Sequence, residues 1–346
     1  MRILICDAKV PFARGGAELL AAALREQLAR RGHEVDEVTI PYNWSKRTDL
    51  LRCGLAWRMV DLRQVWGQRV DLVIATRFPS YAVAHPNKVV WLVHQVRQAY
   101  DWLGTRWSDF NGAPRDARAL AMLRSLDART LGEARARFAI SRNVAGRLRR
   151  FNGLESEVLY PPSKIAPLLR SGAHGDYVFT AGRLDRAKRF DLLLRALALC
   201  ATPVRCKIAG EGPERGPLGE LARELGIAER IEFLGWVDEP RLADLYAEAL
   251  AVYYAPYDED YGYVTIEALL AAKPVVTAAD SGGVLEFVED GAGGVVCAAA
   301  APREFAAAFD RLYRDRDAAR RLGESGRPRV AGIGWDEVIR RLTGAV

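Results

Sequence analysis

The stretch that decides the fold is YDEDYGYVTIEALLAAK, residues 257–273, with its continuation PVVTAADSGGVLEFVEDG as far as residue 291. The apolar run at 249–254 predicts a buried strand, and residues 266–272 predict a helix. A turn around Gly262 joins them, so we expect Glu259 in the loop and Glu267 about one turn into the helix. This succession of strand, turn and helix is typical of an α/β sheet.

The start of this helix predicts an anion site. Backbone N–H groups near Gly262, Tyr263 and Val264 have no partner inside the helix, and the helix dipole favours negative charge there. A phosphate on these groups, with hydroxyls on the two carboxylates, would suit a sugar nucleotide. An ordinary helix with a solvated glutamate and an acidic loop is the alternative.

The segment resembles the retaining, two-domain glycosyltransferases of family 4. It carries E-x7-E within E-[DG]-[YF]-G-x4-E-A, followed by K-P-V-V and S-G-G-x2-E. The spacing holds at Glu259, Gly262, Glu267, Pro274, Gly282, Gly283 and Glu286. Two positions depart from the pattern, because Asp260 and Lys273 stand where glycine is usual.

The resemblance implies the GT-B architecture, an α/β fold with two doubly wound Rossmann-like domains facing a central cleft. We expect an acceptor-side domain at 1–160, a nucleotide-sugar-binding domain at 161–330 and a terminal helix at 331–346 that crosses back to the first domain. Pro161 and Pro162 would interrupt regular structure at the boundary. A chain of 346 residues, 50% of them hydrophobic, is long enough for two such domains.

Charge is unevenly distributed along the chain. Residues 1–160 hold 26 Lys and Arg against 16 Asp and Glu, a net charge of +10, whereas residues 161–346 hold 24 against 28, a net charge of −4. The basic first half suggests an anionic partner, either a phosphate-bearing acceptor or a membrane surface, with solvated helix faces as the alternative. Nucleic acid is not expected, because the arginines are spread over predicted helices without a known nucleic-acid motif.

Three further features predict a cytoplasmic protein, free or peripheral on the inner face of the membrane. The five cysteines form no CxxC pair and no metal-ligand spacing with the four histidines. No apolar run approaches the roughly 18 residues that cross a bilayer. The chain starts directly with a predicted strand and shows no signal peptide.

Residues 49–66 predict an amphipathic helix that packs its apolar face on its own sheet. That face consists of Leu51, Leu55, Met59, Leu62 and Trp66. The basic residues around it are Arg47, Arg52, Arg58, Arg63 and Arg69. Because a basic amphipathic helix can also lie on an anionic membrane, membrane contact is the alternative.

Two candidate sites in the first half follow predicted strands. Gly15 and Gly16 let a ligand approach the backbone closely, and the resemblance places them beside the donor diphosphate and the acceptor. His94 ends the strand at 88–93, on the edge where open α/β sheets bind ligands. The resemblance implies that it positions the transferred sugar. A tight turn and a structural histidine are the alternatives.

The second half contributes a basic pair. Arg183 and Lys188 follow the predicted strand at 177–181, and their guanidinium and ammonium groups suit phosphate oxygens. This G-R-L-x3-K pattern resembles the family's diphosphate clamp, whereas a surface ion pair is the alternative. Gly210 opens a G-x-G-P site of close backbone approach, and Val237 is expected to line the base pocket through main-chain groups.

The resemblance implies a role for each candidate. Glu259 would bind hydroxyls of the sugar and Glu267 those of the ribose. Arg183 and Lys188 would offset the charge on the leaving diphosphate. His94, Glu259, Arg183 and Lys188 are therefore the expected catalytic residues of a retaining enzyme that moves a hexose-type sugar from a UDP- or GDP-sugar to a glycan, lipid-linked or small-molecule acceptor.

Other functions are open to the same fold. A retaining glycosidase needs two carboxyl groups about 5–5.5 Å apart, whereas eight helical residues rise about 12 Å, so Glu259 and Glu267 suit the two ends of a sugar nucleotide better. A nucleotide-sugar epimerase or phosphorylase, and a non-catalytic sugar-nucleotide-binding protein, remain alternatives.

The sequence also contains a candidate metal motif. Asp258-Glu259-Asp260 spells D-x-D, whose oxygens would suit Mg²⁺ or Mn²⁺. We nevertheless expect neither metal nor cofactor, because Arg183, Lys188 and the helix N-terminus already answer the charge of the diphosphate.

Overall fold

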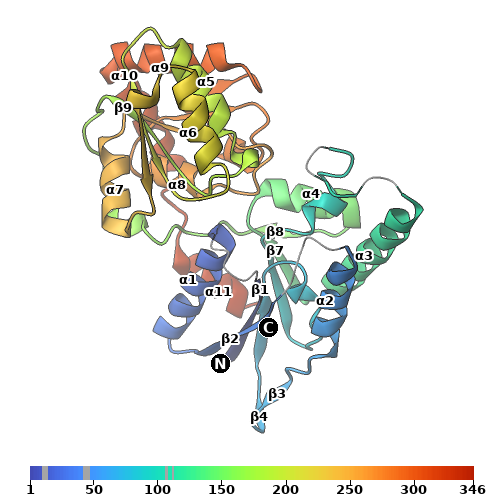
Figure 1. Cartoon of the computed structure of the whole chain (residues 1–346). Coiled ribbons are helices and arrows are strands. Elements are labelled where there is room, and N and C mark those ends of the chain that lie inside the picture. The colour runs from blue at the N-terminus through green and yellow to red at the C-terminus, as the bar shows by residue number, and fades with distance from the viewer. Residues whose placement is uncertain (10–14, 42–46, 106–107, 111–112) are drawn as a thin grey trace. The chain divides into compact units, whose positions relative to one another are not determined.

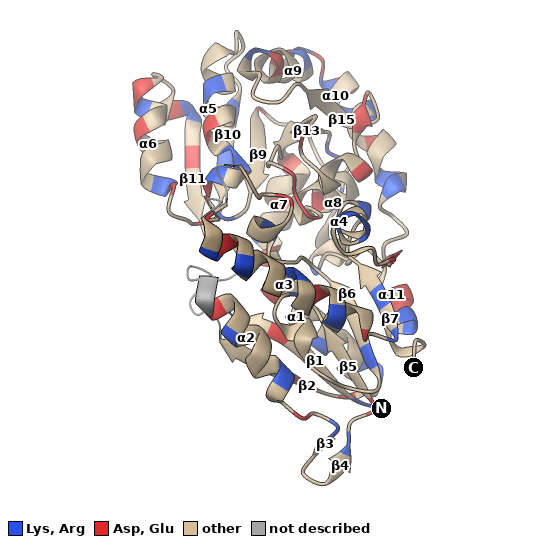
Figure 2. Ribbon diagram, turned by 90° about the vertical axis from the view of Figure 1, so that its right-hand side faces the viewer, with Lys and Arg blue, Asp and Glu red and all other residues tan. Residues whose placement is uncertain are grey.

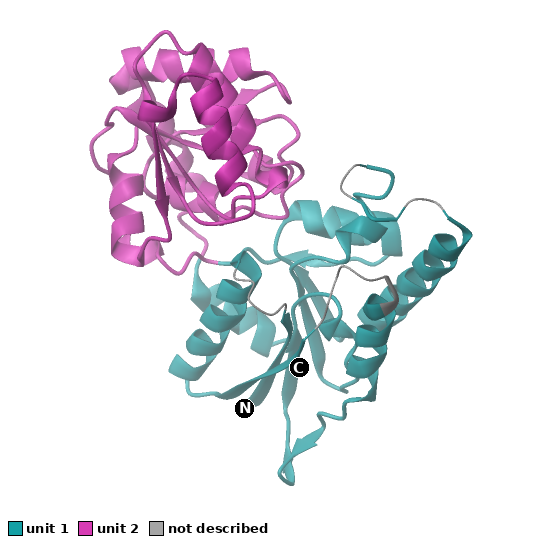
Figure 3. Ribbon diagram, viewed as in Figure 1, with its two compact units in different colours: residues 1–161, 334–346 teal, residues 162–333 magenta. Residues whose placement is uncertain are grey.

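The computed structural model describes residues 1–346 except 10–14, 42–46, 106–107 and 111–112. The chain forms two compact units (Figure 3). Unit 1 comprises residues 1–161 and 334–346, and unit 2 comprises residues 162–333. The division therefore falls between Pro161 and Pro162.

Unit 1 is built on a parallel six-stranded sheet in the order β2-β1-β5-β6-β7-β8. Its strands are β1 (Arg2–Lys9), β2 (Glu34–Pro41), β5 (Leu72–Ala75), β6 (Lys88–Leu92), β7 (Ala136–Ala139) and β8 (Glu157–Val158). Its helices are α1 (Gly16–Arg30), α2 (Arg47–Met59), α3 (Pro114–Gly132), α4 (Arg142–Asn152) and α11 (Trp335–Thr343). Helices α1 and α11 cover one side of the sheet, and α2 and α3 the other (Figure 1).

The terminal helix α11 belongs to unit 1 by its contacts. The Trp335 ring lies edge-on to the buried Trp91 ring of β6, with centroids 6.3 Å apart. Asp336 forms an ion pair with Arg31, at the end of α1. Aromatic packing and an ion pair thus hold α11 on unit 1.

Unit 2 is built on a parallel seven-stranded sheet in the order β11-β10-β9-β12-β13-β15-β14. Its strands are β9 (Tyr177–Ala181), β10 (Arg205–Ala209), β11 (Ile231–Gly235), β12 (Ala251–Tyr253), β13 (Val275–Ala278), β14 (Glu289–Asp290) and β15 (Gly293–Cys297). Its helices are α5 (Phe190–Leu199), α6 (Arg215–Glu224), α7 (Glu239–Glu248), α8 (Tyr263–Leu270), α9 (Pro302–Arg314) and α10 (Arg316–Gly326). Each unit is therefore a doubly wound α/β half, as predicted.

The order of strands in unit 2 locates its ligand edge. The chain builds the sheet outward from β9 to β10 and β11, then returns to the other side of β9 with β12. The carboxyl ends of β9 and β12 consequently flank the point where the winding reverses, which is where open α/β sheets bind ligands. The loops after these two strands carry Arg183, Lys188 and Glu259.

The predicted helix at 49–66 is wrong in its extent and in its buried face. Helix α2 ends at Met59, and a hairpin of β3 (Gln64–Val65) and β4 (Gln68–Arg69) follows. Leu50 and Trp57 are buried instead of Leu55 and Met59, which are 57% and 87% exposed. Gly54 explains the choice of face, because an added Cβ would lie 2.4 Å from Cδ2 of Leu126 in α3. This close approach of α2 and α3 turns the predicted face outward.

Candidate functional site

The loop between β12 and α8 is held by the segment that follows β13. The N–H groups of Asp258 and Glu259 donate to the carbonyls of Asp280 and Ser281, at 2.8 and 3.2 Å. The N–H of Gly283 donates back to the carbonyl of Glu259 at 2.7 Å. A Cβ on Gly283 would lie 2.6 Å from the carbonyl oxygen of Asp260, so glycine is required for this fit. Backbone hydrogen bonds thus join the loop that carries Glu259 to the S-G-G segment after β13.

Glu259 and Lys188 form a largely buried ion pair. The Lys188 ammonium bonds to the Glu259 carboxylate, and their side chains are 20% and 16% exposed. The Tyr254 hydroxyl also donates to this carboxylate, at 2.9 Å, and lies 3.3 Å from Lys188 Nζ. Burial alone would raise the pKa of Glu259, but Lys188 outweighs it and holds that pKa below its ordinary value. Glu259 is therefore an anion beside a fixed cation.

Glu267 has a different environment on α8. Ser163 Oγ donates to one carboxylate oxygen and the Tyr246 hydroxyl to the other, both at 2.8 Å. Burial raises the pKa of Glu267 to about 7, although both hydroxyls act in the opposite direction. The two glutamates of the motif are thus pushed apart in pKa, the arrangement by which paired carboxyl groups take different tasks.

Arg183 lies just after β9 and is exposed. Within the described part of the chain its guanidinium has no hydrogen bond or ion pair. Its neighbour Lys188 lies in a short 3₁₀ turn, Arg186–Lys188. The predicted basic pair therefore consists of one exposed group and one that a carboxylate already neutralises.

Glycines bring the ends of β9, β10 and β11 into direct contact. Gly210 has φ +123°, and a Cβ there would lie 2.0 Å from the carbonyl oxygen of Gly182. The Gly210 N–H donates to the Gly235 carbonyl at 2.7 Å, and the Gly182 N–H to the Ala209 carbonyl at 3.0 Å. The half-buried Val237 follows directly after β11 and Trp236. The surface beside Arg183, at the carboxyl ends of these strands, thus consists largely of backbone atoms.

Gly262 shapes the start of α8. It caps the helix with φ +91°, and a Cβ there would lie 2.8 Å from Cε1 of Tyr254. Tyr263 and Val264 are the first two helical residues, whose N–H groups have no acceptor within a regular helix. The predicted anion-binding N–H groups therefore stand at a helix N-terminus, next to the tyrosine that binds Glu259.

One supporting group was missed in the sequence. Arg189 is buried and donates to the carbonyls of Ala255 and Pro256, at 2.7 and 2.9 Å, and to the Asp280 carboxylate at 2.7 and 3.0 Å. It thereby joins the turn after β9 to the loops after β12 and β13. No sequence signal marks this pairing, because Arg189 and Asp280 are 91 residues apart. Tyr246 and Ser163 were missed for the same reason, since they lie 21 and 104 residues from Glu267. Tyr254 is only five residues from Glu259, but it ends an apolar run that predicts a buried strand and gives no sign of a role at the site.

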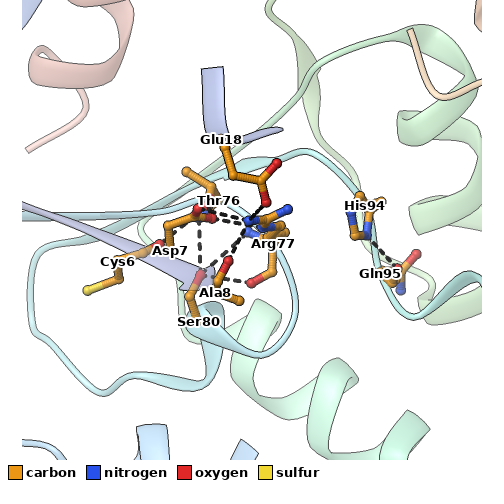
Figure 4. A network of polar contacts seen from close by, with 9 residues as sticks. All are labelled: Cys6, Asp7, Ala8, Glu18, Thr76, Arg77, Ser80, His94 and Gln95. Atoms are coloured by element: carbon orange, nitrogen blue, oxygen red, sulfur yellow. Dashed lines mark hydrogen bonds and ion pairs between the residues drawn. The ribbon is translucent and has the colours of Figure 1, made fainter. Parts of the chain in front are cut away.

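The remaining predicted residues, Gly15, Gly16 and His94, lie in unit 1. Gly15 caps α1 in an extended conformation, and residues 10–14 of this loop lie outside the described residues. His94 follows β6, is half-buried, and has its Nδ1 2.9 Å from the carbonyl oxygen of Gln95 (Figure 4).

A buried charge network stands at the corresponding reversal in unit 1. Arg77, after β5, donates to both carboxylate oxygens of Asp7 at 3.0 and 3.1 Å, to Glu18 of α1 at 2.6 Å, and to the carbonyl of Ala8 (Figure 4). Thr76 adds a hydrogen bond to Asp7. This network ties β1, α1 and the loop after β5 together, and sequence reasoning did not find it.

The D-x-D motif lies in the loop with Glu259. Asp258 has φ +44°, and its backbone N–H donates a hydrogen bond to the carbonyl of Asp280. Within the described residues, no group of three or more His, Cys, Asp or Glu side chains is arranged to hold a metal ion. Among the same residues, none of the helices combines the length and the hydropathy that a membrane span requires.

Comparison with known families identifies unit 2. Residues 170–329 match the family model described as glycosyl transferases group 1, which covers nearly all of this unit. Unit 2 belongs to the group 1 glycosyltransferases. The candidate site built from Lys188, Glu259 and Glu267 thus lies wholly within the group 1 glycosyltransferase domain.

Curated relatives match over about half of this chain. A D-inositol 3-phosphate glycosyltransferase from Frankia alni is 32% identical over 202 residues, 54% of this chain and 49% of the relative. One from Nocardia farcinica is 38% identical over 171 residues, 46% of this chain and 38% of the relative. The chain spans half or less of the length of these relatives.

Solved structures extend the likeness of fold beyond the group 1 domain. A sucrose-phosphate synthase from Thermosynechococcus elongatus aligns with a TM-score of 0.78 at 20% identity and covers 100% of both chains. Anabaena HepE, solved in complex with UDP and glucose, aligns with a TM-score of 0.73 at 19% identity, covering 99% of this chain and 100% of HepE. The predicted GT-B fold class, with two Rossmann-like halves, is confirmed.

Proposed function

We propose that this protein is a retaining glycosyltransferase that moves a hexose-type sugar from a nucleoside-diphosphate sugar to a glycan, lipid-linked or small-molecule acceptor. The observation that carries this proposal is the cluster of Lys188, Glu259 and Tyr254 at the ligand edge of the group 1 domain. A cation, an anion and a hydroxyl held in one largely buried cluster would be costly to maintain without a task.

Exchange of partners at Lys188 would couple donor binding to this cluster. Without donor, Glu259 neutralises the ammonium. A diphosphate, with its greater negative charge, would compete for Lys188 and be held also by the exposed Arg183 and the N–H groups at the start of α8. Glu259 would then turn its oxygens to the hydroxyls of the sugar. The same groups would stabilise the diphosphate as it leaves.

Glu267 would bind the ribose hydroxyls, since its two oxygens are already arranged by the hydroxyls of Ser163 and Tyr246 as hydrogen-bond acceptors. Gly210 and Val237 would admit the nucleotide to the backbone at the ends of β10 and β11. In unit 1, Gly15, Gly16 and His94 would contribute to positioning the sugar and the acceptor. Retention would follow if the departing phosphate takes the acceptor proton on the same face of the sugar.

The relatives suggest which donor and acceptor classes to test first. HepE was solved with UDP and with UDP-glucose, so UDP-sugars are the first donors to test and GDP-sugars the second. The D-inositol 3-phosphate glycosyltransferases suggest a phosphorylated polyol as one acceptor. A phosphorylated or lipid-linked acceptor also agrees with the +10 charge of residues 1–160.

The test has two steps. Thermal unfolding with a panel of UDP- and GDP-sugars identifies the donor, because a ligand at 100 times its Kd stabilises the fold by about 2.7 kcal/mol. The donor is then incubated with each acceptor, release of nucleoside diphosphate is followed, and the anomeric configuration of the product is read by NMR. Release that requires the acceptor and a retained anomer support the proposal.

Each alternative has its own signature in this assay. An epimerase would convert the donor without an acceptor, a phosphorylase would need inorganic phosphate, and a binding protein would be stabilised without turnover. An inverted product would refute retention while leaving sugar transfer in place.

A further inference from the structure

Residues 55–66 hold more exposed large hydrophobic residues than any other stretch of similar length that the structure describes. Four of the eleven exposed large hydrophobic residues fall within it: Leu55 at 57%, Met59 at 87%, Val65 at 40% and Trp66 at 97%. Single exposed hydrophobic residues are normal on a protein surface. Four within twelve residues, one of them a tryptophan that is 97% exposed, favour a contact outside this chain.

Trp66 stands at the tip of the β3–β4 hairpin, which projects from the body of unit 1 (Figure 1). Val65 pairs with Gln68, so Trp66 and Gly67 form a two-residue turn, with φ +53° and +72°. Such turns favour Asn-Gly, and positive φ is unfavourable for a bulky residue. The positive φ of Trp66 is thus an unfavourable backbone conformation that burial of its indole, which is 97% exposed, does not offset.

The charge around the tip narrows the kind of partner. Arg63 and Arg69 flank it, and residues 62–70 contain no Asp or Glu. Arg63 pairs with the exposed Asp61, whereas the Arg69 guanidinium has no hydrogen bond or ion pair within the described residues. Figure 2 shows basic residues on the hairpin and along the helices of unit 1. The tip therefore combines an amphipathic indole with excess positive charge, which suits the interface of an anionic membrane.

We propose that the β3–β4 hairpin docks unit 1 on an anionic lipid bilayer, with Trp66 at the level of the headgroups and Arg69 against the lipid charges. A protein partner is disfavoured, because the tip of a two-stranded hairpin offers far less than the area of a stable protein interface. A bilayer needs only an apolar anchor and a charge. The inference does not rest on the proposed transferase activity.

The alternative of membrane contact through the helix predicted at 49–66 is less favourable than contact through this hairpin, for a physical reason. Arg58 is held by Glu133 through two hydrogen bonds, at 2.5 and 2.8 Å, and Arg52 and Arg63 each have a carboxylate partner. These arginines offer little net charge to a membrane, whereas Arg69 has no carboxylate partner among the residues that the structure describes.

The experiment is co-sedimentation of the full chain with vesicles of phosphatidylglycerol and phosphatidylcholine in equal parts, and with phosphatidylcholine vesicles. The key variant is Trp66→Asn, which creates the Asn-Gly sequence that this turn prefers and so preserves the hairpin. We expect it to bind the anionic vesicles at least about tenfold more weakly, because an indole is among the largest apolar groups a side chain can withdraw from water. Arg69→Gln should bind roughly fivefold more weakly, which corresponds to about 1 kcal/mol per basic residue.

Trp236→Asn is the matched control, because Trp236 is 79% exposed but lies in unit 2; it should bind vesicles as the unmodified protein does. Equal binding of Trp66→Asn and the unmodified protein would overturn the proposal. So would equal binding to both kinds of vesicle. A change of oligomeric state in Trp66→Asn with unchanged vesicle binding would assign the hairpin to a protein contact instead.

Discussion

Lys188 and Glu259, 71 residues apart in the sequence, share one buried ion pair at the edge of the second sheet. Removing either partner leaves the other charge buried and unpaired, which is more costly than losing a surface pair. The pair therefore contributes both to the stability of the protein without ligand and to ligand binding. Variants at the two positions must be compared in their stability and in their affinity for the ligand.

The basic pair can be tested by binding of nucleoside diphosphate. Arg183→Ala and Lys188→Ala should each weaken it at least tenfold, because a hydrogen bond to a charged group is worth roughly 1.5–3 kcal/mol. Calorimetry measures the affinity. Arg186→Ala is the control, since Arg186 lies in the same loop but is 78% exposed and paired with Glu214. Unchanged affinity in both test variants would exclude the clamp.

Variants of Glu259 and Glu267 should differ in which ligand they bind more weakly, because each glutamate is proposed to bind a different part of the donor. Glu267→Ala should weaken free nucleoside diphosphate and the full donor alike, because its proposed partner is the ribose. Glu259→Ala should weaken the sugar-bearing donor and turnover without weakening the free diphosphate, because the variant removes the carboxylate with which the diphosphate competes for Lys188. Parallel titrations with the two ligands measure the difference, and equal losses in both variants would contradict the assignment.

The strands, the placement of Glu259 in a loop and the placement of Glu267 on a helix follow from local apolar patterns and a glycine turn. What the sequence does not reveal is partnership between distant groups. Lys188 was predicted as a phosphate ligand, but its attachment to Glu259 depends on how β9 and β12 pair. The outward face of α2 was predicted as the buried one because Gly54, which lets α2 approach α3, carries no apolar signal of its own.

The stability of unit 2 should depend on pH through Glu267. Its pKa is raised from 4.5 to about 7, so its contribution to folding is complete below 4.5 and is lost as the pH rises through 7. Glu267→Gln keeps the shape but does not titrate. Between about pH 5 and pH 8, the free energy of unfolding should fall in the unmodified protein relative to the variant, by up to about 3 kcal/mol. Urea denaturation measures it; parallel pH profiles would refute the raised pKa.

The stability of unit 1 should likewise fall with rising pH, through Asp127. It is fully buried on α3, accepts a hydrogen bond from Tyr100 at 2.7 Å, and has its pKa raised by burial from 3.8 to about 7. Its contribution to stability is thus lost as the pH rises from 3.8 through 7. Asp127→Asn should unfold at a higher temperature than the unmodified protein at about pH 8, with a smaller advantage at about pH 5. A constant difference in Tm would contradict this.

Turnover should persist in excess EDTA at no less than about half its rate, because Arg183, Lys188 and the start of α8 provide positive charge without a metal. The assay is the nucleoside diphosphate release described above. The D-x-D motif would instead be assigned to a metal if EDTA removed the activity and Mn²⁺ or Mg²⁺ restored it. In that case Asp260→Asn should abolish the activity.

The contact between Gly210 and Gly182 has a consequence for protein engineering. With 2.0 Å between an added Cβ and the opposing carbonyl oxygen, the backbone at one strand end fixes the backbone at the next. Transplanting the loop after β9 from a relative without the loops after β10 and β11 would place mismatched main chains against each other. The three segments therefore form a cassette that must be exchanged together, whereas outward side chains such as Arg183 and Trp236 can be diversified one at a time.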